Sequence, residues 1–241
     1  MTVQPQTLAN ELIDKLAGFA GSEKKPTEFE FDVLKREAKK LESIDPAESA
    51  MCLGMIACLE GDVEECKKQH EKSIRIGRAI NYYVNYCWSL TQFGLIDDYY
   101  QCLEVAVHEY PGDPELLSKL VLITEYLGLY DKTLIYADKL IATKAQHDLP
   151  VDEVKGGVKL ILALGVPAES LQQAYKFVDE VCSKHSVEIE SFSLIPVDGG
   201  VLRRLETKAD VETTVEMNFE LFEKFAEAEN FDLGGLSISF R

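Results

Sequence analysis

Histidine, which often acts as a base, a nucleophile or a metal ligand, occurs at widely separated positions in this chain. The four histidines are His70, His108, His147 and His185. No serine, cysteine or carboxylate near any of them forms a recognisable nucleophile motif. A zinc-protease helix needs a second histidine four residues after the first, and neither His70-Glu71 nor His108-Glu109 has one. The histidines therefore predict no catalytic site, and we interpret His70 as a packed residue of a helix.

The cysteines also lack a paired motif. Six are present, with no Cys-x-x-Cys spacing: Cys52, Cys58, Cys66, Cys87, Cys102 and Cys182. The first five fall on helices of the predicted repeats described below, where we interpret them as small, buried, reduced core residues. Cys182 and His185 have a Cys-x-x-His spacing, but no second pair lies nearby, so no metal site is predicted. The glycine-rich stretches 155–159 and 198–200 lack the spacing of a phosphate-binding loop, so no cofactor is predicted either.

The elements that carry these side chains repeat along the chain. Gly61, Gly94 and Gly128 are 33 and then 34 residues apart, and an apolar pattern of helical spacing lies before and after each of them. Such a unit is two helices joined by a tight turn. A fixed period of this length predicts stacked helical hairpins that bury their faces on one another.

The run 47–145 resembles tetratricopeptide (TPR) repeats. When Ala47, Ile80 and Pro114 are taken as the first positions of three repeats, two positions that are usually small in the family are occupied as follows: the eighth by Gly54, Cys87 and Val121, and the twenty-seventh by Ser73, Ala106 and Leu140. Val121 is larger than the small residue usual there. The resemblance implies a right-handed array of α-helical hairpins.

The array extends beyond these three repeats in both directions. Leu12 and Leu16 belong to an apolar stripe along a helix over 8–20, and Thr27 is a plausible cap for a second helix that ends near Ile44. We interpret this pair as a divergent first repeat. Helices over 151–164 and 167–184, with Gly165 at the turn, predict another hairpin. The sequence therefore predicts about four to five helical hairpins, which form a TPR-like domain over residues 1–186.

From residue 187 onward the apolar period changes to two. A hairpin-type turn at 198–200 is followed by alternating Val201, Arg203 and Leu205, and residues 236–240 alternate again. Residues 211–219 also alternate, which predicts a half-buried strand before a helix that Asn218 caps. A single helix over 210–229 is the alternative. The whole chain is therefore predicted to be mainly α, with a small α+β domain over residues 187–241.

The 241-residue chain has 46% hydrophobic and 28% charged residues and a formal net charge of −17. This acidity argues against nucleic acid as a ligand and favours a basic protein partner, although it could instead simply keep the protein soluble. The first ten residues contain no basic region, and no apolar run approaches the roughly 20 residues that span a bilayer. We therefore expect a cytoplasmic protein that does not bind membranes.

The TPR resemblance also implies a binding surface, because positions two, five, nine and twelve of each first helix line the concave groove of the family. The residues predicted to bind a partner are Met51, Met55, Asn81, Val84, Trp88, Glu115, Leu122 and Glu125. Trp88 could anchor a partner or pack against the neighbouring repeat. Met51 and Met55 could likewise form an apolar floor or be buried by stacking. They also replace the Lys and Asn that the chaperone-binding subfamily requires, so that specialised function is not predicted.

The predicted function is a non-enzymatic protein–protein interaction module that holds a peptide or helix of a protein partner in the groove. One alternative is an acidic inhibitor, immunity protein or chaperone that covers a basic protein. The other is an enzyme with a site between the array and the C-terminal region, for which the sequence nominates no residue.

Overall fold

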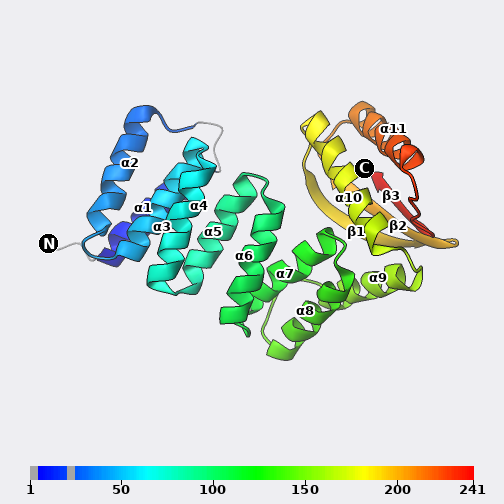
Figure 1. Ribbon diagram of the computed structural model, residues 1–241, viewed down its shortest axis with the longest axis horizontal. Helices are drawn as coiled ribbons and strands as arrows, with labels where there is room; N and C mark the ends of the chain where they lie inside the picture. The colour runs from blue at the N-terminus through cyan, green and yellow to red at the C-terminus, as the bar shows by residue number, and fades with distance from the viewer. Residues whose placement is uncertain (1–4, 21–24) are drawn as a thin grey trace. The chain divides into compact units, whose positions relative to one another are not determined.

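The computed structural model describes residues 5–20 and 25–241 (Figure 1). Eleven helices and three strands are present in this part of the chain. The elements are α1 Pro5–Ala20, α2 Glu28–Leu41, α3 Pro46–Glu60, α4 Val63–Gly77, α5 Ile80–Gln92, α6 Ile96–Glu109, α7 Pro114–Tyr126, α8 Tyr130–Thr143, α9 Val151–Ala163, α10 Ala168–His185, β1 Ile189–Val197, β2 Gly200–Thr207, α11 Val211–Glu227 and β3 Leu236–Phe240. No helix among these described residues is long and apolar enough to cross a bilayer.

The three predicted repeats are the hairpins α3–α4, α5–α6 and α7–α8. Their turn glycines, Gly61, Gly94 and Gly128, have φ values of 82°, 66° and 68°. This left-handed backbone costs least at glycine, which explains why glycine recurs where each first helix ends. Gly165 has the same conformation, with φ of 68°, between α9 and α10. The predicted helical hairpins, including the additional pair before residue 186, are therefore confirmed.

Local signals explain where several helices begin. The Thr27 hydroxyl accepts a hydrogen bond from the Glu30 amide, and the Glu30 carboxylate accepts one from the Thr27 amide, so α2 has the predicted cap in the form of a capping box. Asp45 and Asp113 cap α3 and α7, and each is followed by proline at the first helical position.

The chain forms two compact units, residues 1–111 and 112–241. The first contains α1 to α6, and the second contains α7 to α11 together with the sheet. The domain boundary predicted after residue 186 therefore falls inside the second unit. A single core explains this grouping, because Tyr175 and Val178 of α10 share one hydrophobic cluster with Val201 and Leu205 of β2 and with Met217 of α11.

The sheet has the strand order β1-β2-β3. The predicted turn joins antiparallel β1 and β2, with Val197 paired to Gly200. Strand β3 runs parallel to β2, and α11 provides the crossover between them. Gly200 is required by packing, because a Cβ atom there would lie 1.9 Å from the carbonyl oxygen of Gly235.

The structure corrects the strand predicted over 211–219, since these residues begin α11. Asp210 caps the helix by accepting a hydrogen bond from the Thr213 amide at 2.8 Å. The apparent alternation arose because the apolar residues Val215 and Phe219, which are exposed, lie two residues before and two residues after the buried Met217 in the sequence. A helix with one apolar row in solvent and another in the core imitates a strand over so short a window.

Asn218 is also not the predicted helix cap. It lies inside α11, where its Nδ2 donates to the carbonyl of Phe240 at 3.0 Å and its Oδ1 accepts from the Phe240 amide at 2.9 Å. The side-chain amide therefore joins α11 to β3 by satisfying both backbone groups of Phe240, as the backbone of a paired strand would.

Candidate functional site

In the first unit, the predicted groove residues differ greatly in accessibility. Met51 and Met55 of α3 are buried in the main core cluster of that unit. On α5, Asn81 is exposed, while Val84 and Trp88 are partly buried. The two methionines are therefore buried by stacking and do not form an apolar floor. Among the predicted groove residues of this unit, the accessible ones lie on α5.

Trp88 is partly buried, and its packing role is visible in the structure. Its ring packs against two hydrophobic clusters of the first unit, one containing Met55 and the other containing Cys58 and Cys66. The remainder of the side chain is accessible. An aromatic ring that is held by packing on one side keeps little conformational freedom, which favours its use as a rigid anchor on the other side.

In the second unit, the predicted residues of α7 also diverge. Glu115 and Leu122 are exposed, whereas Glu125 is buried. The carboxylate of Glu125 lies with Oε1 3.9 Å from Nη1 of Arg203 on β2. Glu125 is therefore part of the interior of the unit, while Glu115 and Leu122 lie on its surface.

Arg203 is the centre of a polar cluster that the sequence did not indicate as a site. Its side chain is fully buried, and Nη1 donates hydrogen bonds to the hydroxyls of Tyr175 at 2.8 Å and Tyr130 at 3.3 Å. The guanidinium also lies 4.7 Å from the ring centroid of Tyr175 and 4.3 Å from that of Phe192. One available signal was its register, since Arg203 lies two residues from both Val201 and Leu205 and therefore shares their inward-facing side of the strand.

Burial controls the charge state of this cluster. Desolvation raises the pKa of Glu125 to about 7, and the positive charge of Arg203 opposes part of that rise. Glu125 Oε2 and the Nε and Nη2 atoms of Arg203 have no hydrogen-bond partner among the described residues. Such a cluster is costly to bury. An apolar-walled pocket of about 470 Å³, lined in part by Glu125, Gly157 and Phe192, lies beside it.

His70 has a structural environment. His70 is buried with Nε2 2.8 Å from the hydroxyl of Ser89, and its ring stacks on Tyr86 with 5.1 Å between the ring centroids. Desolvation lowers the pKa of His70 to about 3, so the ring is neutral at physiological pH. Because Ser89 is also buried, a substrate would have no access to this serine–histidine contact. The interpretation of His70 as a packed residue is confirmed.

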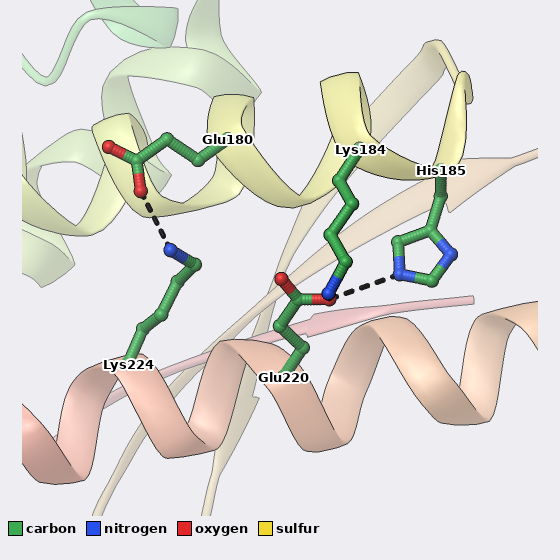
Figure 2. Close-up of polar contacts among 5 residues, drawn as sticks. All are labelled: Glu180, Lys184, His185, Glu220 and Lys224. Carbon is green, nitrogen blue, oxygen red and sulfur yellow. Dashed lines mark hydrogen bonds and ion pairs between the residues drawn. The ribbon is translucent and has the colours of Figure 1, made fainter.

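His185 contributes to the packing of α10 against α11. Its Nε2 lies 3.1 Å from the carboxylate of Glu220, which also accepts from Nζ of Lys184 at 2.9 Å (Figure 2). Cys182, the other member of the Cys-x-x-His spacing, is buried and carries a free thiol. The other five cysteines are likewise buried and free, as the sequence predicted.

Helical hairpins at a period of 33 to 34 residues, with left-handed glycines at their turns, define this fold as a TPR-like array that carries a small C-terminal sheet. No protein-family model and no curated protein matches the sequence. Among solved structures, the chain is similar to one described as "Functional Characterization of Pseudomonas Aeruginosa pilF". The sequence identity is 14%, the match covers 93% of this chain and 95% of that chain, and the TM-score is 0.45.

Proposed function

We propose that this protein is a non-enzymatic interaction module that holds a peptide or helix of a protein partner against the first-helix surface of its repeats. The observation that supports this most directly is Trp88, which is anchored by two hydrophobic clusters and yet remains partly accessible on α5. Asn81, Val84 and Trp88 provide the accessible part of this surface in the first unit. Glu115 and Leu122 are the candidates in the second unit.

The charge of the chain supports a basic partner. With a net charge of −17, association with a positively charged protein is favoured by long-range attraction, and association with nucleic acid is opposed. The same argument supports the second candidate, an inhibitor or chaperone that covers a basic protein. The six free, buried thiols are consistent with a reducing compartment, and we propose the cytoplasm.

The experiment is affinity capture with the full chain, followed by binding measurements on the captured protein. The test variant is Asn81→Arg/Thr91→Arg, because both residues are exposed on α5 and arginine there would repel a basic segment without leaving a cavity. The matched control is Gln101→Arg/Val105→Arg on exposed positions of α6, which adds the same charge to a second helix. We expect the α5 variant to weaken binding strongly and the control to bind nearly as the wild type does. Equal effects of the two variants would refute the α5 surface.

A further inference from the structure

Helix α11 exposes a row of large apolar residues. Val211, Val215, Phe219 and Phe222 have exposed fractions of 83%, 48%, 67% and 54%, and their spacing of four, four and three places them on one side of the helix. Met217 and Leu221, which are fully buried, form the side that packs into the core. Contiguous exposed apolar rows are uncommon on the surface of soluble domains and usually mark an interaction site.

A row of glutamates lies beside the apolar row. This row consists of four exposed residues, Glu212, Glu216, Glu223 and Glu227. The first three each directly follow a member of the apolar row in the sequence. Because successive helical residues are separated by about 100°, the two rows run in parallel along the solvent face. The solvent face of α11 is therefore divided lengthwise into an apolar half and an acidic half.

The remaining charges of α11 are used to hold the helix in place. Glu220 contacts Lys184 and His185 (Figure 2). Nζ of Lys224 lies 2.7 Å from the carboxylate of Glu180 on α10. Lys224 is the only basic residue of α11. Within the described part of the chain, Glu212, Glu216 and Glu223 form no ion pair. The acidic row therefore keeps its charge available to an outside partner.

We propose that these two rows form a docking surface for a basic amphipathic helix of a partner protein. The apolar side of that helix would cover Val215, Phe219 and Phe222, and its lysine or arginine side chains would face the glutamate row. This surface lies wholly on α11, so it is independent of the one proposed on α5.

Charge decides between this partner and the other possible occupants. A second copy of the chain would bring a second set of glutamates to the interface, and like charges oppose that contact. A membrane surface rich in anionic lipid would be repelled in the same way, since interfacial helices are usually basic on the polar side. A basic amphipathic helix is the occupant that matches both rows.

The binding test uses a labelled synthetic helical peptide of the same length as α11, 17 residues, with one row of leucines beside one row of lysines. Its affinity for the full chain is measured by fluorescence anisotropy. Two matched peptides serve as controls: one with every lysine replaced by glutamate, and one with the same composition in scrambled order. We expect the basic amphipathic peptide to bind more tightly than both, and its affinity to fall as the ionic strength is raised.

Protein variants locate the contact. We expect Phe219→Ser/Phe222→Ser to weaken peptide binding roughly 30-fold or more, as loss of a central aromatic pair typically does. Phe29→Ser is the matched control, because Phe29 is 71% exposed on α2 and the chemical change is the same. A second test replaces three residues of the acidic row, Glu212→Gln/Glu216→Gln/Glu223→Gln, and we expect it to weaken binding and reduce its salt dependence. The control has the same change in net charge at exposed positions elsewhere, Glu28→Gln/Glu64→Gln/Glu153→Gln, and we expect it to have a smaller effect. Circular dichroism checks that each variant remains folded.

The proposal would be overturned by unchanged peptide affinity in the phenylalanine variant, or by equal binding of the acidic peptide. It would also be overturned if the wild type bound phosphatidylcholine or phosphatidylglycerol vesicles and the phenylalanine variant did not. A wild-type dimer in sedimentation that this variant dissociates would overturn it as well. The Asn81→Arg/Thr91→Arg variant should bind the peptide as the wild type does. Its behaviour separates a failure at α11 from a failure at α5.

Discussion

Arg203 and Glu125 face each other inside the second unit, with Nη1 3.9 Å from Oε1 and both side chains buried. The arginine is supported by two tyrosine hydroxyls and two aromatic rings, while the carboxylate retains an oxygen without a partner. The stability of this unit should therefore depend strongly on both residues.

Replacing Arg203 with methionine should destabilise the second unit by about 3 to 5 kcal/mol, because Glu125 would then be buried without a compensating charge. The double variant Glu125→Leu/Arg203→Met should lose much less, since it contains no uncompensated charge. Urea unfolding of the two single variants and the double variant at pH 8 measures their coupling. Strictly additive effects would contradict an interaction between the two side chains.

The stability of the second unit should fall as pH rises from about 4.5 to 7. Because the pKa of Glu125 is raised to about 7 in the folded protein, the folded state binds more protons than the unfolded state in this window, and each pH increment favours unfolding. The loss is at most about 3 kcal/mol. Glu125→Gln should abolish this contribution, so the stability of the variant relative to the wild type should be greater at pH 8 than at pH 5. Glu115→Gln, an exposed change on the same helix, is the control.

His70 should impose the opposite pH dependence on the first unit. Its pKa is lowered to about 3, so its contribution to stability is complete above pH 6.5 and is lost as pH falls through the acid range. At pH 5 the loss should be about 2 kcal/mol relative to neutral pH. His70→Gln should remove this dependence. Denaturant titrations of a fragment of residues 1–111 with and without the substitution would show it, and parallel pH curves would refute it.

Gly54→Ala should destabilise the α3–α4 hairpin by about 1 to 3 kcal/mol, which is typical of overpacking. A Cβ atom at this position would lie 2.7 Å from Cδ2 of the buried His70 ring. Gly156→Ala in α9 is the control, because no atom lies within 4 Å of the Cβ position there. That change should stabilise the helix by about 0.5 to 1 kcal/mol. Thermal melts of both variants make the comparison, and equal shifts would count against close packing at Gly54.

Residues 1–111 should fold as an independent helical unit, because the hydrophobic clusters around Met55 and around Cys66 are formed within it. The repeat period alone predicts that the array as far as residue 186 survives deletion of residues 187–241. The core that α10 shares with β2 and α11 predicts instead that α9 and α10 lose their order in this deletion. Hydrogen exchange of the truncated chain decides between these two outcomes.

The sequence by itself determined the features that depend on neighbouring residues. Gly61, Gly94 and Gly128 mark turns because only glycine adopts a left-handed backbone at little cost, and Thr27 begins a helix through a bond to an amide three residues away. These effects act within a few residues, so the period of the repeats, the helical hairpins and the three strands were predictable.

Tertiary structure decided which side chains are accessible and which charges meet. Met51, Met55 and Glu125 occupy groove positions in the repeat pattern, yet contacts with other elements bury them. Arg203 contacts Tyr130 and Tyr175, which are 73 and 28 residues away in the sequence. Helix α11 buries one apolar row, which contains Met217, and exposes a second apolar row, which contains Phe219. Such pairings depend on how distant segments pack, and local apolar patterns do not specify the burial that results.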